Sequence, residues 1–169
     1  VATAVVRYGG HVARYVGDGV LAYFGWPQAH EDQAERALRA GLDIVAAVSV
    51  IKLDFVDTLQ VRIGIDSGQV VVGDIVGHVA SESKAVTGDT ANLAARLQGI
   101  AQAGQIVIGA STEALVGEAF ELHDLGAHPV KGFADEVHAW AVIAERPTES
   151  RFEASRGKNL TTLVGREHE

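Results

Sequence analysis

The sequence predicts an α+β sandwich, in which helices pack on one face of a mostly antiparallel sheet. Stretches with apolar residues at helical spacing alternate with strand-like stretches, several of which come in pairs separated by short connections. The sequence also lacks a Gly-x-Gly-x-x-Gly turn between a strand and a helix, and it lacks a Gly-x-x-x-x-Gly-Lys loop. It therefore does not resemble a dinucleotide-binding unit.

The first elements are expected to be the end of a helix and a β-hairpin. Residues 1–8 fit the end of a helix, and residues 11–16 and 20–24 fit two short strands joined by residues 17–19. Asp-Gly between two apolar runs is a strong hairpin signal, because both central residues of the favoured turn have positive φ. Taken alone, Asp18 is therefore explained as a turn residue.

A long helix and a second hairpin are predicted next. Residues 30–51 carry apolar side chains at helical spacing, and Glu31 and Asp32 lie where they complement the helix dipole. Residues 59–76 combine a stretch of period two with a β-branched run, which favours a hairpin around residues 67–68.

Helical spacing returns in the second half of the chain. Residues 88–101 place Leu93, Leu97 and Ile100 on one helix face. The remaining predicted elements are strands at 105–109, 120–125 and 137–143, with a short helix at 111–116. The polar residues 146–169 lack sustained periodicity, so we expect a domain over residues 1–145 followed by a linker.

Composition restricts the class of partner. A chain of 169 residues with 47% hydrophobic residues can bury a sizeable core as one domain. Its formal net charge of −8 argues against sequence-independent binding to nucleic acid or anionic lipid. No cysteine is present, which excludes disulfides and thiolate metal sites. Since the longest aliphatic run, residues 44–51, is far below the ~18 residues of a membrane span, we expect a cytoplasmic protein.

Four motifs occur in a fixed order: GGHVARYVGDGVLAYFGWPQAHEDQAERALRAGL, VRIGIDSGQVVVGDIVG, VTGDTANLAARLQGIAQAGQIVIG and VKGFADEVHAWAV. Together they resemble the class III adenylate and guanylate cyclases over residues 1–143. The resemblance implies a ferredoxin-like βαββαβ-type cyclase fold whose first strand would be missing from this chain. It is most similar to soluble bacterial forms in which the cyclase domain precedes an ATPase module. Residues 160–169, LTTLVGREHE, are similar to the start of that module, so residues 146–169 would lead to a downstream ATPase-like domain.

The resemblance implies that the ribose 3′ hydroxyl of a purine nucleoside triphosphate, with ATP favoured, attacks the α-phosphate and releases pyrophosphate. Two Mg²⁺ or Mn²⁺ ions per site would neutralise the phosphates. Asp18 would be one of two metal-binding aspartates, and the neighbouring Gly17 would belong to the substrate-binding turn. A tight turn holds a carboxylate rigidly, which suits a small hard cation. The family's other metal-binding aspartate lies on the missing strand.

Three further residues match the family's substrate-binding pattern. Asn92 and Arg96 are four residues apart and therefore share one helix face. By resemblance, Asn92 would orient the ribose and Arg96 would stabilise charge on the α-phosphate, which suits a planar guanidinium. Lys131 would bind the terminal phosphates. Without the resemblance, Asn92 and Arg96 would be an ordinary exposed pair, with Asp89 as a local partner or cap.

The positions that select the base depart from the family's better-known pattern. Cyclases that make cyclic AMP commonly place a lysine on the first hairpin strand and an aspartate or threonine before the third motif's glycine. Here these substrate-binding positions hold Arg14 and Ala85. Arg14 could donate to a base, or it could be a solvent-facing strand residue. Ala85 offers no side-chain hydrogen bond, and Lys84 could replace it only in a different register.

Other polar residues are expected to be structural. The seven histidines show no paired metal-ligand spacing. Asp66 and Asp74 flank the second predicted hairpin and are expected to be turn carboxylates.

Three interpretations of function follow. The first is a homodimeric cyclase in which each active site would form across the interface, as the resemblance implies. The second is a catalytically degenerate cyclase-homology domain that binds nucleotide or dimerises to regulate a downstream module, and Ala85 motivates it. The third is a folded remnant, because a sheet without one strand leaves backbone groups unpaired.

Overall fold

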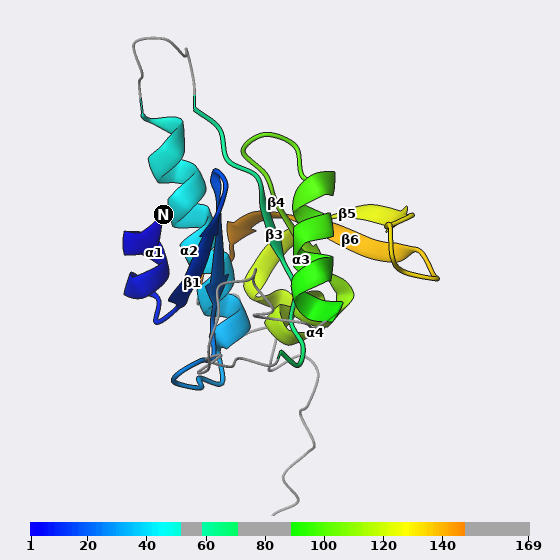
Figure 1. Ribbon diagram of the computed structural model, residues 1–169, viewed down its shortest axis with the longest axis horizontal. Coiled ribbons are helices and arrows are strands. Elements are labelled where there is room, and N and C mark those ends of the chain that lie inside the picture. Colours follow the sequence, from blue (N-terminus) through cyan, green and yellow to red (C-terminus); the bar gives the residue numbers. More distant parts are fainter. Residues whose placement is uncertain (52–58, 71–88, 148–169) are drawn as a thin grey trace, which may run out of the picture.

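The computed structural model describes residues 1–51, 59–70 and 89–147 (Figure 1). Helices and strands alternate along the chain much as their hydrophobic periodicity predicts. In chain order the elements are α1 (Ala2–Arg7), β1 (His11–Val16), β2 (Gly19–Tyr23), α2 (Gln33–Ser49), β3 (Ile63–Ile65), α3 (Asp89–Ile100), β4 (Ile106–Gly109), α4 (Ala110–Val116), the 3₁₀ turn η1 (Gly117–Ala119), β5 (Phe120–His128) and β6 (Val137–Glu145).

The described strands form two sheets. Strands β1 and β2 make an antiparallel pair, and the other four strands form a sheet in the order β3-β4-β6-β5. In that larger sheet β3 runs parallel to β4, whereas β6 is antiparallel to both β4 and β5. The predicted α+β class with a mostly antiparallel sheet is thus confirmed.

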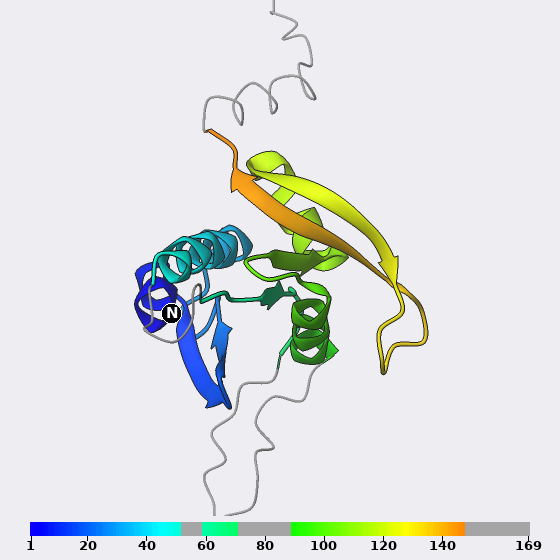
Figure 2. The same cartoon turned by 90° about the horizontal axis from the view of Figure 1, so that it is seen from above.

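Strand β4 is buried on both faces, and this corrects the expectation that helices cover one face. Ile106 and Ile108 pack in one cluster with Leu38 of α2, whereas Val107 packs in another with Leu97 of α3. Successive residues of a strand point to opposite faces, so α2 and α4 cover one face and α3 covers the other (Figure 2). The continuous apolar run of β4 is typical of a strand between two helix layers.

Helix α3 lies directly against β3 because Gly64 has no side chain. A Cβ atom added at Gly64 would collide with the backbone of α3 at Ala94 and Gln98. The helix backbone therefore occupies the space where a side chain would stand. This close contact determines which side of α3 faces solvent.

One predicted connection differs from the structure, and a second lies partly outside the described residues. The first hairpin turns at Gly17 and Asp18, so that Val16 pairs with Gly19, and β2 begins one residue earlier than expected. The positive φ of 59° falls on Gly17, for which it has no steric cost. Of the second predicted hairpin, β3 pairs with β4, and residues 71–76 lie outside the described part of the chain.

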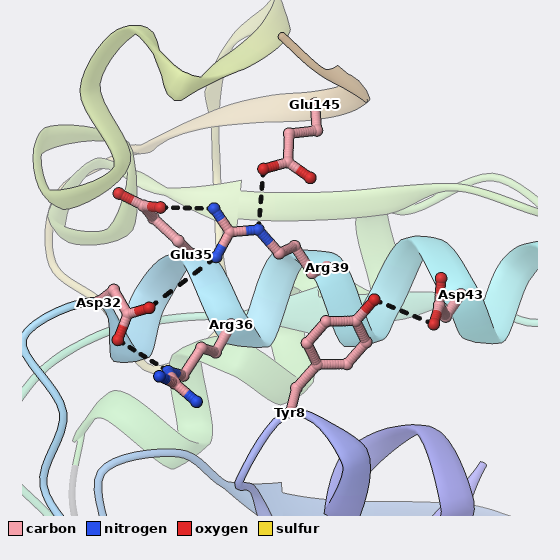
Figure 3. A network of polar contacts seen from close by, with 7 residues as sticks. All are labelled: Tyr8, Asp32, Glu35, Arg36, Arg39, Asp43 and Glu145. Atoms are coloured by element: carbon pink, nitrogen blue, oxygen red, sulfur yellow. Dashed lines mark hydrogen bonds and ion pairs between the residues drawn. The ribbon is translucent and has the colours of Figure 1, made fainter. Parts of the chain in front are cut away.

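A polar network joins the start of α2 to the end of β6 (Figure 3). Arg39 lies at its centre, with a side chain that is 20% exposed. Its Nε donates to Glu145 at 2.8 Å and its Nη2 donates to Glu35 at 2.7 Å. Asp32 lies 3.9 Å from Arg39 and accepts a 2.7 Å hydrogen bond from Arg36. The network fixes the first turns of α2 against the last strand.

Helix α1 is attached to the middle of α2, at Asp43, one turn after Arg39. Val5 is buried, and the Tyr8 hydroxyl donates to Asp43 of α2 at 3.1 Å (Figure 3). Arg7 pairs with the same carboxylate at 3.2 Å, but its side chain is 72% exposed. Exposed ion pairs contribute little to stability. The buried Val5 and the Tyr8 hydrogen bond therefore hold α1, the helix that precedes the β1–β2 hairpin, in place.

The close packing of α3 on β3 leads to a stability prediction. We expect Gly64→Ala to lower the free energy of unfolding by about 1–3 kcal/mol, because the new methyl group must displace helix backbone. The control is Gly99→Ala in helix α3. An added Cβ at Gly99 meets no atom of the described residues within 4 Å, and alanine favours the helix by up to about 1 kcal/mol relative to glycine. Urea unfolding followed by circular dichroism measures both. Equal midpoints for the two variants would contradict the close contact.

Candidate active site

Asp18 lies at the turn of the β1–β2 hairpin, where the sequence predicted a rigidly held carboxylate. Its side chain is exposed, and it makes no hydrogen bond or ion pair with another described residue. Gly17 beside it has the positive φ that the two-residue turn requires. The hairpin therefore presents a carboxylate whose oxygens are all available to a ligand.

A β-bulge determines where Arg14 lies. Val12 pairs with Ala22 and Arg14 pairs with Leu21, so Ala13 is an extra residue in β1. Such a bulge reverses the faces of all later residues in its strand. Arg14 is half-buried, and its Nε is buried without a hydrogen-bond partner among the described residues. A wholly solvent-facing Arg14 does not fit this burial.

Tyr23 is a polar residue of this hairpin that the sequence analysis missed. It is 9% exposed, and its hydroxyl is buried without a partner in the described part of the chain. Burial raises the pKa of Tyr23, against the smaller lowering effect of the Arg14 charge. The phenol therefore stays neutral near pH 7. Tyr23 lies in the apolar run VLAYF, so the sequence suggests an ordinary core aromatic residue. Only the bulge in β1 shows that Arg14 shares its face of the hairpin.

Asn92 and Arg96 lie one turn apart on the exposed side of α3. Both side chains are exposed and form no hydrogen bond or ion pair with described residues, Asp89 included. Leu97 of the same helix is fully buried. Helix α3 is thus anchored through its apolar side and presents an amide and a guanidinium to solvent on one face, as their four-residue spacing predicts.

Lys131 lies in the loop between β5 and β6 and is exposed. The loop encloses a hollow of about 300 Å³ lined by residues 129–136, Lys131 among them. Ala85, together with Lys84 and Asp74, lies outside the described residues. The expected linker beyond residue 147 does so as well.

The predicted site residues lie on three separate elements of the chain. Asp18 is on the first hairpin, Asn92 and Arg96 are on α3, and Lys131 is on the β5–β6 loop. No hydrogen bond or ion pair between described residues joins these groups. Within one copy of the described chain, the four groups are therefore not tied to one another by direct polar contacts.

Asp18 fits one ligand position of a magnesium or manganese ion. Among residues 1–51, 59–70 and 89–147, no three histidine, aspartate or glutamate side chains are grouped so that they could hold a metal ion. Mg²⁺ is usually bound through one or two carboxylates together with substrate phosphates and water, not by an all-protein cage. An exposed, unpaired carboxylate on a tight turn has the chemistry of such a donor.

Asp66 is a second group whose setting the sequence did not reveal. It directly follows β3, and its Oδ1 is buried, without a partner in the described structure, against Gly109. Burial raises the pKa of Asp66 to about 6, against a smaller lowering by the backbone N–H of Ser67. The neighbouring Ser67 shares a 2.9 Å hydrogen bond with the buried Thr112. Asp66 is thus a partly buried carboxyl group and not a solvated turn residue.

The family described as Adenylate and Guanylate cyclase catalytic domain matches the chain over residues 7–144. The chain belongs to this family. It is a class III adenylate/guanylate cyclase domain, as its motifs suggested. Adenylate cyclase 2 of Rhizobium meliloti (strain 1021) is 30% identical to the cyclase domain over 151 residues, which cover 85% of this chain. The chain spans 40% of the length of that relative, and 16% of a second, uncharacterized protein of the same organism.

Solved structures show the same fold. The adenylyl cyclase CyaB from P. aeruginosa matches the cyclase domain with a TM-score of 0.78 at 28% identity, over 86% of this chain and 77% of that one. The guanylate cyclase domain of RhGC from Catenaria anguillulae, solved in complex with GTP, matches with a TM-score of 0.74 at 29% identity, over 86% and 78%. The comparisons therefore include both adenylyl and guanylyl cyclases.

Helices of the cyclase domain are too short or too polar to cross a bilayer, as far as the described residues extend.

The burial of Asp66 leads to a prediction of pH-dependent stability. Its folded pKa of about 6 lies above the ordinary 3.8, so the unfolded chain releases this proton first. The contribution of Asp66 to the free energy of unfolding is therefore fully present below about pH 4 and is lost as the pH rises through 6. After allowance for solvent screening, we expect a fall of about 1–2 kcal/mol between pH 4 and 7, which Asp66→Asn removes.

The control for this measurement is Glu121, an exposed carboxylate on β5 that makes no hydrogen bond or ion pair with another described residue. Glu121→Gln should keep the fall between pH 4 and 7 that Asp66→Asn loses, in urea unfolding at a series of pH values. Parallel profiles for wild type and Asp66→Asn would contradict the assignment.

Proposed function

We propose that this cyclase domain converts a purine nucleoside triphosphate, with ATP favoured, to the 3′,5′-cyclic monophosphate and pyrophosphate. The observation that carries the proposal is a set of exposed polar groups at the family's positions that pair with no other described residue: Asp18, Asn92, Arg96 and Lys131. The similarity to Adenylate cyclase 2 and to CyaB supports ATP. Residues 1–145 would form the catalytic domain, and residues 146–169 would lead to an ATPase-like domain.

Each group has a role that follows from its chemistry. Asp18 would hold Mg²⁺ or Mn²⁺, and two such ions per site would supply charge neutralisation at the phosphates. The Arg96 guanidinium donates several N–H groups in one plane and suits the charge that develops on the α-phosphate. Asn92 holds the ribose through its amide, and Lys131 places a flexible positive charge at the terminal phosphates.

We infer that the complete site forms between two copies of the chain. Asp18 and Arg96 lie on separate elements, and neither has a partner among the described residues of its own chain. A two-fold symmetric dimer can bring the hairpin of one copy opposite α3 of the other, and would then build two equivalent sites. A monomer would present only incomplete halves.

The second candidate function is a regulatory module that binds nucleotide or dimerises without turnover. The observation in its favour is Ala85, which offers no side-chain hydrogen bond to a base. The exposed carboxylate, amide, guanidinium and ammonium groups favour catalysis instead, because dimerisation alone requires none of them at these positions.

The proposed reaction is tested by product formation. Cyclic AMP and cyclic GMP are measured with the full-length protein, given ATP or GTP in turn with Mg²⁺ or Mn²⁺. We expect Asp18→Asn, which preserves side-chain size but removes the charge, to lower activity by about 100-fold or more. Glu121→Gln, an exposed carboxylate on β5, is the matched control. Nucleotide binding without product would favour the regulatory module.

The shared site is tested by mixing two inactive variants. Asp18→Asn and Arg96→Ala would each be inactive alone, because each removes one half of every site. In an equal mixture, half of the dimers pair the two variants and keep one intact site, so we expect about a quarter of wild-type activity. Mixed activity no greater than the sum of the two variants would contradict a site formed between copies.

A further inference from the structure

Two buried polar atoms of the first hairpin lack hydrogen-bond partners among the described residues. They are the Nε of Arg14 and the hydroxyl oxygen of Tyr23. A buried donor or acceptor without a partner is costly, and native structures leave few of them. Their chemistry is complementary, because a guanidinium nitrogen can only donate whereas a phenol oxygen can also accept.

The bulge at Ala13 places these two side chains on the same face. Arg14 pairs with Leu21, and Tyr23 lies two residues beyond Leu21 on the same strand. Residues diagonal to each other across a strand pair are about 7–8 Å apart, which long and aromatic side chains can span. Without the extra residue, Arg14 would point to the opposite face and could not approach the hydroxyl.

We propose that Tyr23 is a positioning residue for Arg14: in the nucleotide-bound state Arg14 Nε–H donates to the Tyr23 hydroxyl, so that the terminal guanidinium nitrogens face the purine base. The inference rests on the proposed function, because it assigns Arg14 to the base. One hydrogen bond satisfies both buried atoms. It leaves the two terminal nitrogens of the half-buried Arg14 to donate to a ring nitrogen of adenine.

The hydrogen bond matters because Arg14 loses rotamer freedom when it binds a base, and this loss weakens binding. A bond to Tyr23 that forms in the bound state offsets this loss. Ala85, outside the described residues, has no side-chain group that could share the contact with the base. The orientation of Arg14 therefore has a large effect on how well the base is held.

The test removes the hydroxyl oxygen alone. We expect Tyr23→Phe to raise the KM for ATP about tenfold, to change kcat less than twofold, and to lower the preference between ATP and GTP. The control is Tyr15→Phe, since Tyr15 is 69% exposed and pairs with Val20 on the other face of the hairpin. It should leave KM unchanged.

A merely structural role for Tyr23 gives a different result. Because the unliganded hydroxyl has no partner in the described structure, Tyr23→Phe should melt at the same temperature as wild type or higher. A lower melting temperature with an unchanged KM would overturn the proposal. In an Arg14→Ala background, which has no side-chain donor, the effect of Tyr23→Phe should fall below twofold. An undiminished effect there would also overturn it.

Binding separates this inference from the proposed function. The dissociation constant of 3′-deoxy-ATP, which lacks the attacking hydroxyl, is measured by calorimetry for the full-length protein and for the Arg14 and Tyr23 variants. If no cyclic nucleotide forms but Tyr23→Phe weakens binding only when Arg14 is present, the proposed reaction fails and the positioning role stands. Equal affinities for wild type and Tyr23→Phe, or no binding by any variant, overturn the positioning role.

Discussion

Strand β4 has no face toward solvent, because Ile106 and Ile108 pack with α2 and α4 while Val107 packs with α3. This burial on both sides fixes the other layers. Helix α3 must lie flat on β3 and β4, and Gly64 permits the backbone contact. Because the apolar side of α3 packs against the sheet, Asn92 and Arg96 lie on the side of the helix that faces solvent. Their exposure therefore follows from core packing and needs no separate explanation.

The first hairpin is held by different contacts. It forms a sheet of its own, attached through the buried Val5 of α1 and the hydrogen bond from Tyr8 to α2. One turn earlier in α2, Arg39 donates a hydrogen bond to Glu145 of β6 (Figure 3). Helix α2 thus connects the element that carries Asp18 to the sheet on which α3 rests. Among the described residues, the candidate metal ligand lies on the β1–β2 pair, whereas the candidate phosphate-binding group lies on a helix that packs on the four-stranded sheet.

Features set by local sequence could be predicted, and features set by distant contacts could not. The hairpin, the two long helices and the shared face of Asn92 and Arg96 follow from periodicity over a few residues. The short apolar run of β4 does not indicate whether helices cover one face of the strand or both. Its parallel partner β3 lies about forty residues earlier in the chain, too far for local periodicity to predict the pairing. Asp66 is buried by Gly109, which belongs to another strand. The setting of Tyr23 depends on a one-residue bulge that no composition pattern announces.

The buried atoms of Arg14 and Tyr23 also bear on the choice between catalysis and regulation. Exposed groups such as Asp18 and Lys131 remain solvated and carry little folding cost. A buried donor or acceptor without a partner, in contrast, costs about 1–3 kcal/mol. A domain that only dimerised would be more stable with apolar side chains at positions 14 and 23. In the proposed nucleotide complex the two groups would meet beneath a base, and their hydrogen bond would offset this cost. The two buried atoms are therefore better explained by the proposed nucleotide binding than by a purely structural role.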